Sequence, residues 1–124
     1  MTVEVRYLVH DVNAAAEFYL SHLGFTDEEN WGAPFRMLSC GELRLWVSGP
    51  ESSAARSMPD GSQPEPGGWN RFVVEVDDIE AEVARLRDAG VRFRGDIVTG
   101  PGGKQVVIED PSGNPVELFQ PAKN

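Results

Sequence analysis

The chain has 124 residues, a size typical of one domain, and 11 Lys and Arg against 20 Asp and Glu give it a net charge of −9 at pH 7. This negative excess is repelled by phosphate, so we expect no nucleic acid and no membrane among its partners. No apolar run approaches the roughly 20 residues of a membrane span, and no signal-peptide pattern opens the chain, which predicts a cytoplasmic protein. The single cysteine, Cys40, excludes an internal disulfide and a cysteine-rich zinc site.

The first predicted elements are a short strand that ends before Asp11 and a helix from Val12 to Leu23. Apolar residues recur on one face of this helix, Asp11 can cap its first turn, and Gly24 can end it in a left-handed conformation. The same pattern returns 67 residues later, where Asp78 precedes a second predicted helix and Gly90 ends it. The sequence therefore contains a degenerate internal repeat.

Three strand-like runs follow each predicted helix. They are Phe25 to Trp31, Phe35 to Leu38 and Leu43 to Val47 in the first half, and Arg92 to Val98, Gln105 to Glu109 and Val116 to Phe119 in the second. The stretch 110–114 has the Asp, Pro and Gly spacing of a type I turn. The loop 99–104 is glycine-rich but precedes a strand, which favours a hairpin over a phosphate-binding loop.

A segment rich in small and turn-forming residues separates the two halves. Of the 22 residues from Gly49 to Asn70, 12 are Gly, Pro or Ser, which predicts either a mobile linker or a loop that folds over a ligand. The predicted organisation is one domain, residues 1–124, with a βαβββ module at 1–48, the linker at 49–70 and a second βαβββ module at 71–124. Neither module is large enough to bury its helix and sheet well alone, so we expect the two to combine.

This arrangement resembles the vicinal oxygen chelate superfamily, which includes glyoxalase I, fosfomycin-resistance enzymes, extradiol dioxygenases and bleomycin-resistance proteins. The resemblance covers essentially the whole chain and is carried by residues 9–12 (VHDV), 23–25 (LGF), 76–79 (VDDI), 89–91 (AGV) and 108–118 (IEDPSGNPVEL). It implies an α+β fold in which two βαβββ modules form a curved, mostly antiparallel mixed sheet around a cleft, commonly in a homodimer.

Metal-dependent members of this superfamily take their ligands from the first and last strands of each module. The resemblance places these positions at Glu4, at Arg71, at Glu117, and at either Leu45 or Trp46. An arginine has no lone pair for a cation and repels a divalent ion. We therefore expect no metal and no other cofactor, with Glu4 and Glu117 forming a charge-assisted network around Arg71.

Each candidate site residue also has a purely structural interpretation. Glu117 can be half of a structural ion pair with Arg71, and Glu4 faces outward if its strand slips by one residue. Aromatic residues on strands belong to a core as readily as to a cleft. Cys40 has no histidine placed to activate it, which favours an inert thiol. The predicted ligand-binding residues are Glu4, Trp31, Phe35, Trp46, Arg71, Glu117 and Phe119.

Two functions fit these residues, and the sequence does not decide whether the protein is an enzyme. The first is a metal-independent small-molecule binding protein that sequesters an aromatic or cationic ligand, since aromatic rings and carboxylates bind such molecules. The second is a lyase, isomerase or dioxygenase that uses a divalent metal or acid–base chemistry at Glu117, the one candidate catalytic residue. A structural or regulatory module is a third class, and only the linker offers it a contact surface.

Overall fold

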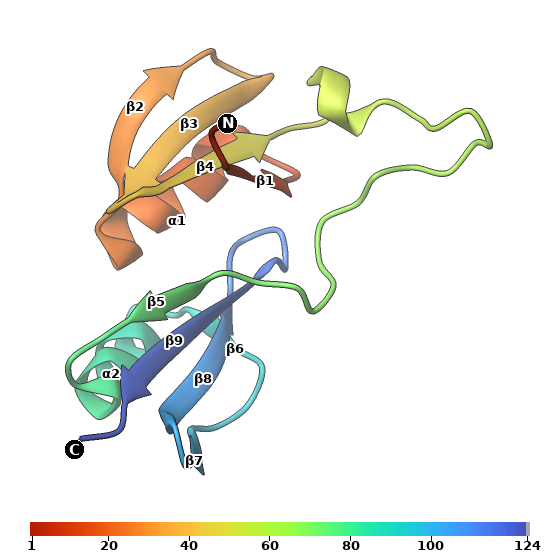
Figure 1. The fold of residues 1–124 in the computed structure, drawn as a ribbon. Helices are drawn as coiled ribbons and strands as arrows, with labels where there is room; N and C mark the ends of the chain where they lie inside the picture. The colour runs from red at the N-terminus through yellow and green to blue at the C-terminus, as the bar shows by residue number, and fades with distance from the viewer. Residues whose placement is uncertain (124) are drawn as a thin grey trace. The chain divides into compact units, whose positions relative to one another are not determined.

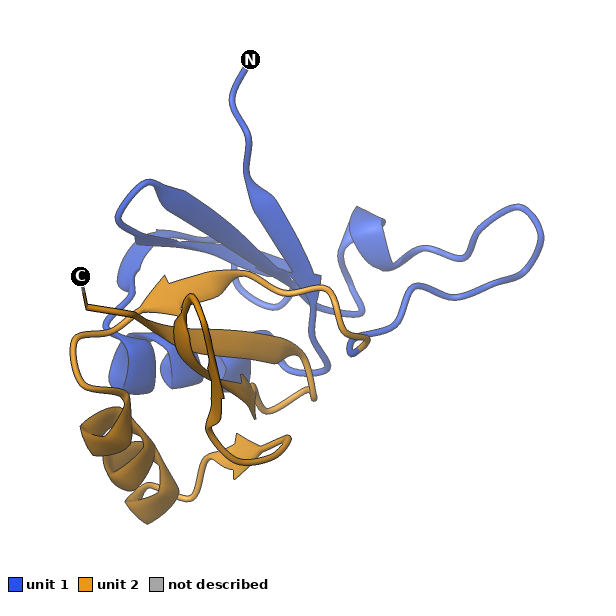
Figure 2. Ribbon diagram, turned by 60° about the horizontal axis from the view of Figure 1, so that its bottom comes forward, with its two compact units in different colours: residues 1–67 blue, residues 68–124 orange. Residues whose placement is uncertain are grey.

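The computed structural model describes residues 1–123, and the chain divides into two compact units, residues 1–67 and residues 68–124 (Figure 2). The elements of the first unit are β1 (Val5–Leu8), α1 (Val12–Leu23), β2 (Thr26–Asn30), β3 (Phe35–Cys40), β4 (Leu43–Ser48) and a short 3-10 helix (Ser53–Ala55). Those of the second unit are β5 (Val73–Glu75), α2 (Ile79–Asp88), β6 (Arg92–Phe93), β7 (Val98–Gly100), β8 (Gly103–Glu109) and β9 (Pro115–Pro121). Neither α1 nor α2 is long and apolar enough to cross a bilayer.

Each unit is a strand, a helix and an antiparallel run of strands (Figure 1). The first sheet has the order β1-β4-β3-β2, in which β1 runs parallel to β4 and the other pairs are antiparallel. The second sheet repeats this order as β5-β9-β8-β6, with β7 also paired to β8 and β5 parallel to β9. The prediction of an α+β fold with mixed, mostly antiparallel sheets is confirmed.

The caps of both helices form as the repeat predicts. Asp11 accepts a hydrogen bond from the Ala14 amide at 3.0 Å, and Asp78 accepts one from the Ala81 amide at 3.1 Å. Gly24 follows α1 with a φ of 69°, a left-handed conformation that costs a residue without a side chain little. The same local chemistry therefore begins both helices.

Each helix covers one face of its own sheet and leaves the other face to different residues. In the first unit Leu38, Leu45 and Val47 are fully buried on the face that packs against α1. In the second unit the buried apolar side chains include Ile79 and Leu86 of α2, and Val106, Ile108, Val116 and Leu118 of β8 and β9. Side chains alternate along a strand. Trp46 in the first sheet and Glu117 in the second each follow a buried residue, so each lies on the face of its own sheet that is turned away from the helix.

One predicted strand is wrong and one predicted turn is confirmed. The single strand expected over 92–98 is split into β6 and β7, because Gly95 adopts a φ of 149° between them. The turn at 110–114 closes with a hydrogen bond from the Gly113 amide to the Asp110 carbonyl at 3.0 Å. The buried Asp110 carboxylate further accepts from the Ser112 amide at 2.9 Å, the Asn114 amide at 2.9 Å and the Asn114 side chain at 3.0 Å.

Part of the glycine-rich segment lies against the first unit. Its residues 63–66 and residues 8–10, at and just after the end of β1, line a common hollow of about 230 Å³. Ser52 stabilises the start of the segment by donating to the Gly49 carbonyl at 2.7 Å. Residues 56–63 are exposed and project away from the rest of this unit as a loop (Figure 1), so a mobile linker and a loop that folds over a ligand both stay predictions.

Candidate functional site

In the first unit the candidate residues gather on the sheet face opposite α1. Trp46 of β4 donates its indole N–H to Glu4 at 2.6 Å, just before β1 begins. Phe35 of β3 lies beside Trp46 with ring centroids 5.1 Å apart, and Trp31 stacks on Phe35 at 5.7 Å. The three rings, which we call the aromatic ladder, bring together four of the residues that the sequence predicts for binding.

The aromatic ladder ends in an arginine that the sequence reasoning missed. The guanidinium carbon of Arg6 lies 5.5 Å from the centroid of the Trp46 ring. The parallel register pairs Arg6 with Trp46 across β1 and β4, so the contact follows from the sheet itself. The signal was present in the sequence, because Arg6 is two residues after Glu4 and therefore shares its strand face.

In the second unit Arg71 and Glu117 form the ion pair that the sequence predicts. Arg71 Nε and Nη2 both donate to Glu117 Oε1, at 3.0 and 2.9 Å. The Arg71 side chain is 25% exposed and that of Glu117 12%, so water screens this pair only partly. Phe119 follows two residues after Glu117 on β9 and shares its face. The predicted inclusion of Glu4 in this network stays a prediction, since Glu4 belongs to the first unit.

The strand registers decide which residue of β4 corresponds to Glu117. The repeat offset of 67 residues relates Arg6 to Val73, and Val73 pairs with Glu117 as Arg6 pairs with Trp46. Of the two alternatives left by the sequence, Trp46 is therefore the counterpart, whereas Leu45 belongs to the core under α1. The same offset relates Glu4 to Arg71.

The second unit also contains an aromatic ring, that of Trp69, that contacts an arginine. Trp69 is 69% exposed, yet the guanidinium of Arg94 lies 4.6 Å from its ring centroid. Arg94 also binds the carboxylate of Glu109 at 2.7 Å and the carbonyls of Gly68 at 2.6 Å and Gly113 at 2.8 Å. Arg94 was not predicted, because its partners come from three separate parts of the sequence.

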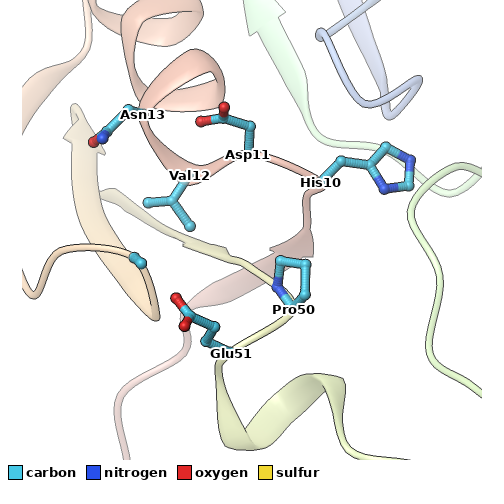
Figure 3. A pocket seen from close by; sticks show the side chains of 7 residues that line it. His10, Asp11, Val12, Asn13, Pro50 and Glu51 are labelled. Atoms are coloured by element: carbon cyan, nitrogen blue, oxygen red, sulfur yellow. The ribbon is translucent and has the colours of Figure 1, made fainter.

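A hollow of about 420 Å³ lies in the first unit where α1 begins (Figure 3). Val12, Pro50 and Glu51 surround it, and the ring of His10 points away from Glu51. The Asp11 carboxylate beside it already caps α1. None of the predicted binding residues lines this hollow.

The pKa shifts of the described residues fall outside these clusters. The bond from Lys104 to Glu80, at 2.7 Å, lowers the pKa of the Glu80 carboxyl below its ordinary value. The hydroxyl and amide of Ser62 lower the pKa of Asp60 in the same way. Within residues 1–123, no group of three or more His, Cys, Asp or Glu side chains is arranged to hold a metal ion.

The chain thus contains two modules of one strand, one helix and further strands, and in each the opening strand runs parallel to the closing strand. Comparison with known families identifies the class of protein that this arrangement defines. Residues 3–118 match the family described as Glyoxalase/Bleomycin resistance protein/Dioxygenase superfamily. The chain belongs to this family, as the sequence resemblance predicts.

Solved structures share the fold at low sequence identity. Lactoylglutathione lyase from Agrobacterium tumefaciens is 22% identical with a TM-score of 0.73, over 96% of this chain and 92% of that one. The fosfomycin resistance protein FosX from Listeria monocytogenes is 11% identical with a TM-score of 0.74, over 98% and 93%. TnmS3, an antibiotic binding protein from Streptomyces sp. CB03234, is 24% identical with a TM-score of 0.66, over 98% of each chain. A comparison with curated proteins gives no match.

Proposed function

We propose that the protein is a metal-independent small-molecule binding protein of the glyoxalase and bleomycin-resistance type, which sequesters an aromatic or cationic ligand. The observation that carries the proposal is the set of residues at the four corresponding strand positions: Glu4, Trp46, Arg71 and Glu117. An indole and a guanidinium have no lone pair to offer a cation, so two of the four positions do not fit a metal. The antibiotic-binding relative TnmS3 is consistent with a binding role.

The two remaining carboxylates are occupied by neighbours within their own units. Glu4 accepts from the Trp46 indole and Glu117 accepts twice from Arg71. Each of these N–H donors supplies positive charge, or the positive end of a dipole, at a carboxylate that would otherwise attract an ion. The aromatic ladder meanwhile offers ring surface for stacking, with Trp31 62% exposed.

Elemental analysis and calorimetry test the proposal directly. We expect protein purified without chelators or an affinity tag to carry no stoichiometric divalent ion, and a stoichiometric ion would overturn metal independence. We expect at least one planar aromatic compound to bind in calorimetry and Trp46→Ala to abolish its heat. Trp46→Phe keeps a ring and serves as the control that separates stacking from the hydrogen bond to Glu4. No heat from planar compounds would refute a binding role.

A gain of metal affinity tests the assignment of Arg71 to a ligand position. Arg71→His replaces the guanidinium with an imidazole next to Glu117, and we expect it to raise affinity for Zn²⁺ or Ni²⁺. Arg92→His is the matched control, because Arg92 also lies near a carboxylate, that of Glu109 at 3.7 Å, but on another strand. Equal affinities in the two variants would mean that Arg71 does not occupy a ligand position.

An enzyme function is the second candidate, and one observation favours it. The two hydrogen bonds that Arg71 donates to Glu117 both go to Oε1, and Oε2 accepts none within the described part of the second unit. That oxygen could accept a proton from a substrate. Turnover of a bound compound that disappears in Glu117→Gln, with binding retained, would favour catalysis over sequestration.

The homodimer is implied by the resemblance, whereas the location and the combination of the modules were predicted from the sequence itself. We propose that the two modules combine in one domain and that the protein is a cytoplasmic homodimer. Light scattering at several protein concentrations would test the dimer, and a monomer at all of them would refute it.

A further inference from the structure

Arg6 is an exposed cation without an acidic partner in its own unit. Of the 11 Lys and Arg side chains, seven form ion pairs with Asp or Glu, although acidic residues outnumber basic ones by 20 to 11. No carboxylate of the first unit lies within 4.0 Å of Arg6, whose described contact is with the ring of Trp46 at 5.5 Å. Arg44 and Arg56 of this unit also form no ion pair with any described residue, but of these three arginines Arg6 is the one whose guanidinium lies against an aromatic ring.

The carboxylates that share this sheet face are engaged by other donors. Glu4 accepts from the Trp46 indole at 2.6 Å, and Glu29 accepts from the Trp31 indole at 3.2 Å. Glu28 accepts from the Ser39 hydroxyl at 2.6 Å. The other basic residue of this face, Arg44, lies two residues before Trp46 and is also exposed. Arg6 is thus the cation placed directly against the aromatic ladder.

We propose that Arg6 binds an anionic group, a carboxylate or a phosphate, on a flat aromatic ligand whose rings lie against the aromatic ladder. This inference rests on the proposed binding function and names the ligand class. The contact with the Trp46 ring keeps the guanidinium beside the aromatic ladder, and its N–H groups can form bidentate bonds to an oxyanion. Sheet register fixes the backbones of the two residues opposite each other, so only side chains have to be ordered on binding.

A purely cationic ligand fits this arrangement less well. Arg6 already lies over the Trp46 ring, and the ring of Phe35 contacts both indoles. A second cation at Trp46 would have to displace Arg6 or accept its repulsion. The net charge of the chain attracts cations at long range, but the guanidinium of Arg6, which contacts the aromatic ladder, attracts anions.

Four pyrene probes that differ only in their substituent test this inference. They are pyrene carboxylate, pyrenyl phosphate, pyrenemethanol and pyrenylmethylammonium, and binding is measured by calorimetry and by quenching of tryptophan fluorescence. We expect one of the two anionic probes to bind about tenfold more tightly than the neutral probe, the gain typical of a charge-assisted hydrogen bond. The carboxylate and the phosphate arms distinguish which oxyanion Arg6 prefers.

Arg6→Gln and Arg56→Gln form a matched pair of variants. Both remove one exposed arginine of the first unit, but Arg56 lies in the loop and away from the ladder. We expect Arg6→Gln to erase the anionic preference, measured as the ratio of the affinity of the preferred anionic probe to that of pyrenemethanol, and Arg56→Gln to keep this ratio as in the unmodified protein. The inference would be overturned if the ammonium probe bound as tightly as the anionic probes or more tightly, or if Arg6→Gln and Arg56→Gln changed the anionic preference equally. Either result would leave the binding function intact. No binding by any probe would overturn both.

Discussion

Replacing Arg71 with methionine tests whether the ion pair with Glu117 stabilises the second unit. Methionine preserves the length and apolar stem of the side chain but removes every donor to Glu117. The carboxylate, with 12% of its side chain exposed, would then have no cation beside it. Because burial penalises a lone charge more than a matched pair, the variant should lose stability.

The size of this loss follows from the burial of the pair. Removing one partner of a fully buried pair costs about 3–5 kcal/mol, whereas exposed pairs contribute at most about 1 kcal/mol. Arg71 is 25% exposed, which lets water screen part of the interaction, so we expect a loss of about 2 kcal/mol. Glu117→Gln leaves an arginine that can reach solvent and should cost less, about 1 kcal/mol.

Urea unfolding of the two single variants and the double variant measures the coupling. We expect the double variant, Arg71→Met with Glu117→Gln, to lose at least about 1 kcal/mol less unfolding free energy than the two single losses added together. The reason is that the double variant contains no uncompensated carboxylate. Circular dichroism and tryptophan fluorescence should give the same midpoint. Losses that add to within about 0.5 kcal/mol would refute the reasoning and leave Arg71 and Glu117 without a mutual structural role.

Three other changes probe the second unit. Asp110→Ala removes the acceptor of three hydrogen bonds in a buried turn, and we expect it to lower the free energy of unfolding by about 3 kcal/mol or more in urea titrations. Gly103→Ala would place a Cβ 2.1 Å from a carbonyl of β9 at a φ of 144°, so its thermal midpoint should fall sharply, whereas Gly102→Ala has open space and should change little. A carboxyl titration by NMR should show Glu80 with a pKa below its ordinary value, and Lys104→Met should return it upward. The lowered pKa means that the bond stabilises the fold above the ordinary pKa of Glu80 and is lost as the pH falls through the lowered one.

The fold was predictable because local signals repeat and agree. Asp11 and Asp78 mark the starts of both helices through their own side chains, which needs no knowledge of distant residues. The strand-like runs that follow each helix identified β3, β4, β8 and β9, whose inner faces are buried under the helices. The break at Gly95 was missed, because a run of strand-forming residues does not reveal where the backbone stops pairing with the neighbouring strand.

The site was predictable only in part, since register is a property of paired strands. The sequence left Leu45 and Trp46 as alternatives, and a slip of one residue exchanges the core face for the site face. The pairing of β1 with β4 decides between them. Arg6 and Arg94 were missed because their roles depend on which ring each guanidinium reaches, at 5.5 and 4.6 Å, and composition carries no information on that.

In both units a carboxylate is hydrogen-bonded by an N–H donor at the corresponding pair of strand positions, but the carboxylate and the donor have exchanged places. In the first unit the carboxylate of Glu4 precedes the opening strand, β1, and the N–H donor, Trp46, is on the closing strand, β4. In the second unit the donor, Arg71, precedes the opening strand and the carboxylate, Glu117, is on the closing strand. Each unit therefore contributes one carboxylate that is already matched by a donor unable to bind a metal. A single substitution at either donor frees one carboxylate of its own unit, but a metal site needs several ligands, so we expect Arg71→His to raise metal affinity without restoring a complete site.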